Sequence, residues 1–330
     1  MTYYSRITGT GSGLPERTVT NAEMEKYVDT SDEWIRTRTG IEARRIADPA
    51  LGESTLSLST LAARSALKAA GIEGSEIDAI IVGTVSPDTV MPSVGNYLQA
   101  LIGAHNAFSF DLSAACSGFV YGLSIADAYI RTGQVRNALV VGAETLSTLM
   151  NWKDRSTCVL FGDAAGAAVL QRTEDPAHAI LSTKIHSDGR HSNILAIPHG
   201  YGKVPVYSAE YRNDKHKIQM MGAEVFKLAV RSMVECSQEV LKDNGVTVDQ
   251  VDHFIFHQAN LRIIDMCTKT LGIPSEKVAV NLQRYGNTSA ATLPVCLDEG
   301  MRAGRVKPGE LVLMATFGGG VTWGSALIRI

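Results

Sequence analysis

A cysteine between an apolar run and a helical pattern is the first candidate for chemistry in this sequence. Residues 108–112 form a short apolar run, small residues follow, and Cys116 then precedes an amphipathic pattern at 119–130. This order predicts a strand–turn–helix elbow with the thiol at its tip. Because a helix N-terminus stabilises anions, we expect it to lower the pKa of the thiol. The alternative is a buried core cysteine, the usual state of an unpaired one.

A histidine and an asparagine are the candidate partners of this thiol. His257 ends the apolar run 254–256, and α/β folds place catalytic groups after their buried strands. Asn287 lies in a Gly-Asn turn, where its amide can donate to a reacting carbonyl oxygen. The alternatives are a core histidine and a turn in which Thr288 or Ser289 caps a helix. The glycine-rich turn at 317–320 can present a backbone N–H to an oxyanion.

The elements that must position these residues read as strands alternating with helices. Short apolar runs at 79–82, 138–141, 254–256 and 311–314 are typical of strands buried on both faces. Helical periodicity covers 61–69 and 225–233, and Thr20 with Glu23 has capping-box spacing at the start of a short helix. This alternation predicts an α/β layered fold. The polar stretch 187–219, rich in Gly, His and Pro, reads as an inserted loop region.

An internal repeat divides the chain into two similar parts. LKAAGIEGSEIDAIIVGT from Leu67 aligns without gaps with LKDNGVTVDQVDHFIFHQ from Leu241, and GQVRNALVV at 133–141 resembles GRVKPGELVL further on. In this alignment Cys116 falls opposite Asn287, at a slightly shorter offset. We therefore expect two duplicated halves, 1–175 with the cysteine and 176–330 with the histidine and asparagine. The chemistry would lie at their junction.

Composition excludes several classes of protein. The 330 residues are 45% hydrophobic and 20% charged, with a net charge of −3. This balance argues against a nucleic-acid-binding or membrane-bound protein. The N-terminal sequence lacks the apolar core of a signal peptide, and no apolar run is long enough for a membrane span. Five cysteines without a CxxC pair predict neither a disulfide framework nor a zinc site, so we expect a cytoplasmic protein.

Six motifs in order along the chain match one enzyme family. They are TSDEWIRTRTGI at 30–41, DLSAACSGF around Cys116, FGDAAGAAVL at 161–170, HQAN at 257–260, GNTSAAT at 286–292 and FGGGVTWGSAL near the C-terminus. Together they cover nearly the whole chain, which resembles a β-ketoacyl-[acyl-carrier-protein] synthase III. The resemblance implies a thiolase-like fold, a five-layer αβαβα sandwich. It also implies an acyltransferase of fatty acid biosynthesis that works as a homodimer.

The resemblance implies a role for each candidate. Cys116 would take the acyl group of an acyl-CoA, and malonyl-acyl-carrier-protein would then lose carbon dioxide. His257 and Asn287 would stabilise the resulting enolate by donating hydrogen bonds. The enolate would attack the acyl group on Cys116, while the N–H groups of Cys116 and Gly319 hold the oxyanion. No metal or organic cofactor is needed, because decarboxylation drives the reaction.

Further positions match the substrate-binding residues of the family. Trp34 and Arg155 match the pair that sandwiches the CoA adenine, and Arg38 matches a residue near the nucleotide phosphates. Asn260 matches a position along the pantetheine channel. Three basic residues match the docking surface for the acidic carrier protein; they are Lys227, Arg262 and Lys269. The alternatives are a buried tryptophan and ordinary solvated charges.

One position departs from the family pattern. Met91 stands where well-known members have phenylalanine, at a residue that crosses the dimer interface and forms the floor of the partner's acyl pocket. Because methionine is flexible, we expect a pocket that accepts chains longer or more branched than acetyl.

Other functions remain open at this stage. A specialised relative in secondary metabolism would condense a different acyl or aroyl thioester, or would use malonyl-CoA in place of the carrier protein. A cysteine hydrolase would also use Cys116 and His257, with the histidine acting as a base on water. A non-catalytic scaffold would have no use for the trio.

Overall fold

Two β-sheets form the centre of the molecule. The computed structural model describes residues 2–200, 202–204 and 214–330. The first sheet has the order β1 (Tyr4–Gly13), β7 (Asp163–Thr173), β6 (Asn137–Thr145), β4 (Ala79–Gly83), β5 (Phe108–Leu112). The second has the order β11 (His253–Phe256), β12 (Leu311–Gly318), β13 (Thr322–Arg329), β8 (Ile180–Ser187). All four strands predicted from apolar runs are present. The strands β4 and β12 are completely buried, and β6 is buried except at Asn137.

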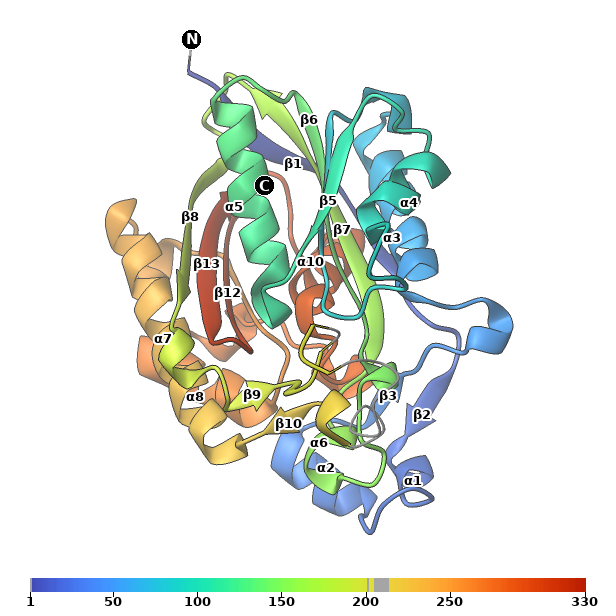
Figure 1. Cartoon of the computed structure of the whole chain (residues 1–330). Coiled ribbons are helices and arrows are strands. Elements are labelled where there is room, and N and C mark those ends of the chain that lie inside the picture. Colours follow the sequence, from blue (N-terminus) through green and yellow to red (C-terminus); the bar gives the residue numbers. More distant parts are fainter. Residues whose placement is uncertain (1, 201, 205–213) are drawn as a thin grey trace.

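Helices cover both faces of each sheet and give five layers (Figure 1). Between the sheets lie α5 (Gly118–Arg131) and α10 (Thr292–Arg302), each of which contacts strands of both sheets. The outer layers are α3 (Thr55–Ala70) with α4 (Val94–Leu101), and α7 (Gly222–Asp243) with α8 (Leu261–Leu271). The expected αβαβα sandwich is therefore confirmed. The two segments with predicted helical periodicity, 61–69 and 225–233, lie inside α3 and α7.

Smaller elements extend from the end of the sandwich at which the central helices begin (Figure 1). They are β2 (Thr18–Thr20) paired with β3 (Ala43–Arg45), β9 (Leu195–Ala196) paired with β10 (Gln219–Met220), and the helices α1 (Asn21–Met24), α2 (Asp32–Thr39), α6 (Arg155–Cys158) and α9 (Leu282–Tyr285). The capping box of Thr20 and Glu23 is present at α1. Within the predicted loop region 187–219 the structure adds β9 and the start of β10, while residues 201 and 205–213 of that region lie outside the described part.

Each half contains an equivalent hydrogen bond between an aspartate and a neighbouring strand. The Asp78 carboxylate accepts a hydrogen bond from the Asn137 N–H at 2.9 Å, and Asp252 accepts one from the Leu311 N–H at 2.7 Å. Each aspartate thus ties the strand β4 or β11 to its parallel neighbour. These matching contacts support the proposal that 1–175 and 176–330 are duplicated halves.

The sequence alignment of the repeat was wrong at the elbow. Two non-glycine residues have positive φ angles, Ala115 at 45° and Ser289 at 51°. Each begins a single 3₁₀ turn, η3 (Ala115–Ser117) or η10 (Ser289–Ala291), that leads directly into α5 or α10. The structural counterpart of Cys116 is therefore Ala290, and Asn287 lies before the equivalent turn.

Glycine allows the central helices to approach the sheets. A Cβ atom at Gly142 of β6 would lie 2.2 Å from the Ala290 carbonyl oxygen, and one at Gly83 of β4 would lie 2.7 Å from the Gly118 carbonyl carbon. Neither contact is possible for a real side chain. The starts of α5 and α10 therefore depend on these glycines to reach the middle of the molecule.

We predict that Gly142→Ala destabilises the protein by about 3 kcal/mol, the upper part of the range for overpacking. The added methyl group would overlap backbone at Ala290, which cannot rotate away. The measurement is the free energy of unfolding in urea. Gly189→Ala is the control, because its Cβ would meet nothing within 4 Å. Equal stability of the two variants would contradict this account of the packing.

Candidate active site

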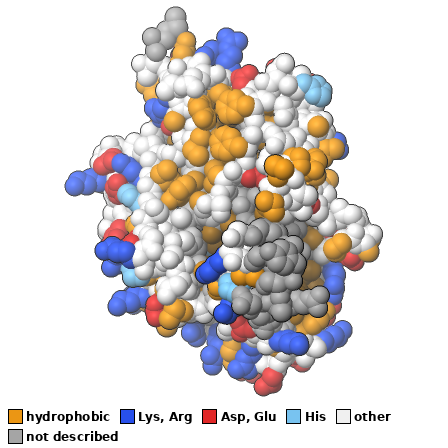
Figure 2. Space-filling view, in the orientation of Figure 1, with side chains coloured by type: hydrophobic (Ala, Val, Ile, Leu, Met, Phe, Trp, Pro, Cys, Tyr) orange, Lys and Arg blue, Asp and Glu red, His pale blue; other side chains and the backbone are white. Residues whose placement is uncertain are grey.

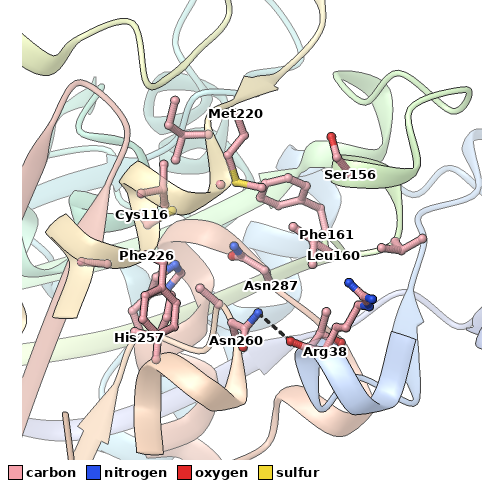
Figure 3. Close-up of a pocket in the computed structure, with 18 of the residues that line it drawn as sticks. Arg38, Cys116, Ser156, Leu160, Phe161, Met220, Phe226, His257, Asn260 and Asn287 are labelled. Carbon is pink, nitrogen blue, oxygen red and sulfur yellow. Dashed lines mark hydrogen bonds between the residues drawn. The ribbon is translucent and has the colours of Figure 1, made fainter. Parts of the chain in front are cut away.

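The three candidate catalytic residues line one pocket, although they come from distant parts of the chain (Figure 3). The pocket has a volume of about 290 Å³ and contains Cys116, His257 and Asn287. Cys116 lies in η3 before α5, His257 follows β11, and Asn287 follows α9. The structure thus brings together one residue of the first half and two of the second.

Cys116 lies in the predicted strand–turn–helix elbow, between β5 and α5. Strands of the other half hold this turn: the Thr316 hydroxyl donates to the Cys116 carbonyl oxygen at 2.9 Å, and the Thr322 hydroxyl donates to the Ala114 carbonyl oxygen at 2.8 Å. Burial raises the pKa of the Cys116 thiol to about 12, and the nearby Glu144 charge adds to the rise. The expected lowering of the pKa was therefore wrong, because removal from water outweighs the favourable groups around the thiol.

His257 is buried and neutral at physiological pH. Its backbone N–H donates to the Ala315 carbonyl oxygen at 2.8 Å, which continues the contact between β11 and β12. Its ring Nδ1 lies 2.8 Å from the hydroxyl oxygen of Thr292. Burial lowers the pKa of His257 to about 3. The imidazole can therefore offer a single N–H to its surroundings.

Asn287 is held by its backbone and by the oxygen of its side chain. Its N–H donates to the Leu160 carbonyl oxygen at 2.8 Å, and its own carbonyl oxygen accepts from the Gly162 N–H at 2.9 Å. Its Oδ1 accepts a hydrogen bond from the Ser289 N–H at 2.9 Å. This bond orients the side-chain amide, with its Nδ2 group on the side opposite to the Ser289 N–H. Neither Thr288 nor Ser289 caps α10 with its side chain, since the N-cap residue is Ala291. The capping alternative is therefore wrong.

A buried carboxylate beside this site was missed in the sequence. Glu144, at the end of β6, accepts hydrogen bonds from Ser289 Oγ at 3.1 Å, Ser86 Oγ at 2.5 Å and the Val85 N–H at 3.1 Å. Burial raises the pKa of Glu144 to about 7. Glu144 thus links the loop after β4 to the turn η10, which begins two residues after Asn287. An acidic residue within the apolar run at 138–147 was the available signal.

The residues matched to CoA binding gather at the outer part of the pocket. Trp34 of α2 has the guanidinium carbons of Arg38 and Arg155 each 4.6 Å from its ring centre. The Asn260 side chain caps α8 through the Arg262 N–H at 2.9 Å and donates to the Arg38 carbonyl oxygen at 3.2 Å (Figure 3). These contacts join α2, α6 and α8 around one opening.

A second cavity, of about 360 Å³, also reaches Cys116. Its walls are mainly apolar and include Val85, Leu146, Ile197 and Ile218. Gly319 lies on the wall as well, so the structure brings it close to the elbow. Met91 is in neither cavity of its own chain. It lies between β4 and α4, and its side chain is 85% exposed.

The three basic residues matched to carrier-protein docking are exposed on the outer helices. Lys227 lies on α7, and Arg262 and Lys269 lie on α8, which packs against α7. Arg262 also donates to the Thr37 carbonyl oxygen of α2 at 3.2 Å, so α8 approaches the opening of the pocket. Arg262 therefore lies beside the opening, and Lys227 directly follows Phe226, which lines the pocket.

The part of the chain that the structure describes lacks two features that would indicate other kinds of protein. No group of three or more His, Cys, Asp or Glu side chains in that part of the chain is arranged to hold a metal ion. None of its helices combines the length and the apolar character that crossing a membrane requires.

Known proteins resemble this chain along its whole length. Residues 110–189 match the family model of 3-oxoacyl-[acyl-carrier-protein (ACP)] synthase III, and residues 241–330 match the model of its C-terminal part. The β-ketoacyl-[acyl-carrier-protein] synthase III of Alkalilimnicola ehrlichii is 52% identical over 330 residues, which is 99% of each chain. The protein of the same name from Xanthomonas campestris is 50% identical over 99% of this chain and 98% of its own.

Solved structures agree with the sequence comparisons. The 3-oxoacyl-[acyl-carrier-protein] synthase III of Aquifex aeolicus has a TM-score of 0.91 at 47% identity and covers 99% of this chain and 100% of its own. The Thermus thermophilus enzyme has a TM-score of 0.91 at 41% identity, over 98% of each chain. The thiolase-like fold is confirmed by these likenesses. The chain belongs to the β-ketoacyl-[acyl-carrier-protein] synthase III family.

Proposed function

We propose that the protein makes a β-ketoacyl thioester in two half-reactions at Cys116. An acyl group is first transferred from acyl-CoA to the thiol, and malonyl-acyl-carrier-protein then condenses with it and loses carbon dioxide. The observation that carries this proposal is the convergence of Cys116, His257 and Asn287 on one pocket. A thioester-forming nucleophile and two hydrogen-bond donors are what an acyl transfer followed by enolate chemistry requires.

In the first half-reaction Cys116 Sγ bonds to the acyl carbon, and the bond from that carbon to the CoA sulfur breaks. The thiol proton leaves with the CoA sulfur. The backbone N–H groups of Cys116 and Gly319 stabilise the tetrahedral oxyanion. Support comes from the position of both residues on the wall of the second cavity, where the acyl chain would lie.

In the second half-reaction the malonyl carboxylate leaves as carbon dioxide, and its bonding electrons form an enolate. His257 and Asn287 donate hydrogen bonds to the enolate oxygen. Its carbon then attacks the acyl carbon, and Cys116 leaves as a thiolate that regains a proton from solvent. The loss of carbon dioxide drives the step, so we propose that no metal or organic cofactor takes part.

The substrates would bind from the outer opening of the pocket. We propose that Trp34, Arg38, Arg155 and Asn260 hold the nucleotide and pantetheine parts of CoA. Stacking on an indole and charge from guanidinium groups suit an adenine with phosphates. The free, buried state of all five cysteines fits the reducing environment of the cytoplasm, where we place the reaction.

We predict that Cys116→Ala forms no acyl-enzyme, whereas His257→Ala and Asn287→Ala still form it. The two latter variants should lose condensation about 10²-fold or more, because each lacks a donor to the enolate oxygen. Intact mass after incubation with acyl-CoA measures the first step, and release of labelled carbon dioxide from malonyl-acyl-carrier-protein measures the second. Unchanged acylation of Cys116→Ala would refute the nucleophile. Hydrolysis of acyl-CoA without condensation would instead indicate a cysteine hydrolase.

We also propose a homodimer that forms along the edge of the first sheet. The strand β5 is one of the two edge strands of that sheet, and β1 is the other. Four apolar side chains on or near β5 and α4 are exposed; they are Val90, Tyr97, Leu101 and Phe108. Hydrophobic side chains gather on this part of the surface in Figure 2. Exposed strand edges and apolar patches are the surfaces through which identical chains associate.

Such a dimer would account for the exposure of Met91, because the Met91 side chain would reach the acyl cavity of the partner. We predict that the protein accepts acyl chains longer than acetyl, and that Met91→Phe shifts the preference toward shorter chains. Acyl-enzyme trapping with acetyl- to decanoyl-CoA measures this. Met266→Phe, an exposed position on α8, is the control. A strict acetyl preference of the unmodified protein would contradict the prediction.

The exposed basic residues of α7 and α8 should bind the carrier protein. We predict that Lys227→Glu with Lys269→Glu raises the KM for malonyl-acyl-carrier-protein more than tenfold, because charge complementarity with an acidic partner is lost. Acylation by acyl-CoA should stay unchanged. Arg305→Glu, an exposed charge in the loop that follows α10, is the control. Equal use of malonyl-CoA and the malonyl-carrier protein would count against a docking role and favour a specialised relative.

A further inference from the structure

We propose that Thr292 is a positioning residue that donates its hydroxyl hydrogen to Nδ1 of His257 and so places the single ring N–H at Nε2, toward the substrate. This inference rests on the proposed function, in which His257 donates a hydrogen bond to an enolate oxygen. It assigns a role to a residue that itself does not touch the reacting atoms.

The contact between the two side chains is short and buried. The Thr292 hydroxyl oxygen lies 2.8 Å from His257 Nδ1, and the exposed fractions of the two residues are 2% and 3%. Thr292 is the first residue of α10, and His257 directly follows β11. Because both positions are held by secondary structure, the ring has one fixed neighbour at Nδ1.

The number of protons decides which nitrogen can donate. Burial lowers the pKa of His257 to about 3, so the ring is neutral and carries one N–H. The thioester oxygen of the malonyl group is an acceptor before and after it becomes an enolate oxygen. The single N–H must therefore be at Nε2 when the enolate forms. Nδ1 is then an acceptor, and the hydroxyl of Thr292 is the group in contact with it.

A competing arrangement exists around the same hydroxyl. In that arrangement the Thr292 hydroxyl donates to the Ser289 carbonyl oxygen, which lies 2.9 Å away. A hydroxyl that donates there would leave Nδ1 as the donor and Nε2 as a lone pair facing the substrate, which repels an enolate. However, the Ser289 carbonyl oxygen already accepts the backbone N–H of Thr292. That oxygen therefore keeps one hydrogen bond when the hydroxyl turns its proton to Nδ1, which is the arrangement that an N–H at Nε2 requires.

The test separates the hydroxyl from the shape of the side chain. Thr292→Val keeps the branched shape and removes the donor, whereas Thr292→Ser keeps the donor. We expect Thr292→Val to form the acyl-enzyme within about twofold of the normal rate but to lose release of carbon dioxide about 10²-fold, as for removal of one donor to an oxyanion. Thr292→Ser should recover most of this loss. Thr60→Val, a buried helical threonine of α3, is the control for general effects of the change.

A spectroscopic measurement tests the tautomer directly. In protein with ¹⁵N-labelled histidine, the His257 resonances, assigned with His257→Ala, should show the proton at Nε2 at neutral pH, and Thr292→Val should shift it toward Nδ1. A proton at Nδ1 in the unmodified protein, or full decarboxylation by folded Thr292→Val, would overturn the role of Thr292. Loss of decarboxylation in His257→Ala would leave the proposed function intact in that case. Full decarboxylation by His257→Ala would instead overturn the proposed function.

Discussion

The structure depends on the exclusion of water from the groups around Cys116. The thiol and the imidazole are both buried, and each is driven to its neutral form. In water a histidine titrates near pH 6.5 and a cysteine near pH 9.0, but a low-dielectric interior penalises the charged form of either. A neutral imidazole and a neutral amide can both donate a hydrogen bond to an oxyanion. Burial thus sets the neutral state of His257 on which the proposed stabilisation of the enolate relies.

Long-range contacts hold these buried polar groups in place. The elbow of the first half is bound by Thr316 and Thr322 of the second, and Glu144 of the first half accepts from Ser289 of the second. A buried polar group without a partner would cost about 1–3 kcal/mol, so each of these bonds offsets part of the cost of burial. The glycines of β4 and β6 contribute by letting α5 and α10 start at the same place. The site is therefore assembled by the packing of the two halves.

The surroundings of the thiol differ between its two cavities. One leads outward to aromatic and guanidinium groups and suits a charged, nucleotide-bearing carrier of the acyl group. The other has apolar walls and suits an acyl chain. Because both reach Cys116, the proposed transfer moves the acyl group from one environment to the other without movement of the sheets.

The sequence by itself determined the buried strands β4, β5, β6, β11 and β12, the helices α3, α5 and α7, the elbow of Cys116 and the family, because periodicity and motif order are local properties of the chain. It also singled out His257, at the end of an apolar run, and Asn287, in a Gly-Asn turn. The tertiary structure alone decided the direction of the thiol pKa, the true counterpart of Cys116 in the repeat and the parts of Glu144 and Thr292. Those properties depend on burial and on contacts between segments far apart in the chain, such as Glu144 with Ser289. Local patterns carry no information about which distant groups will exclude water from a side chain or bond to it.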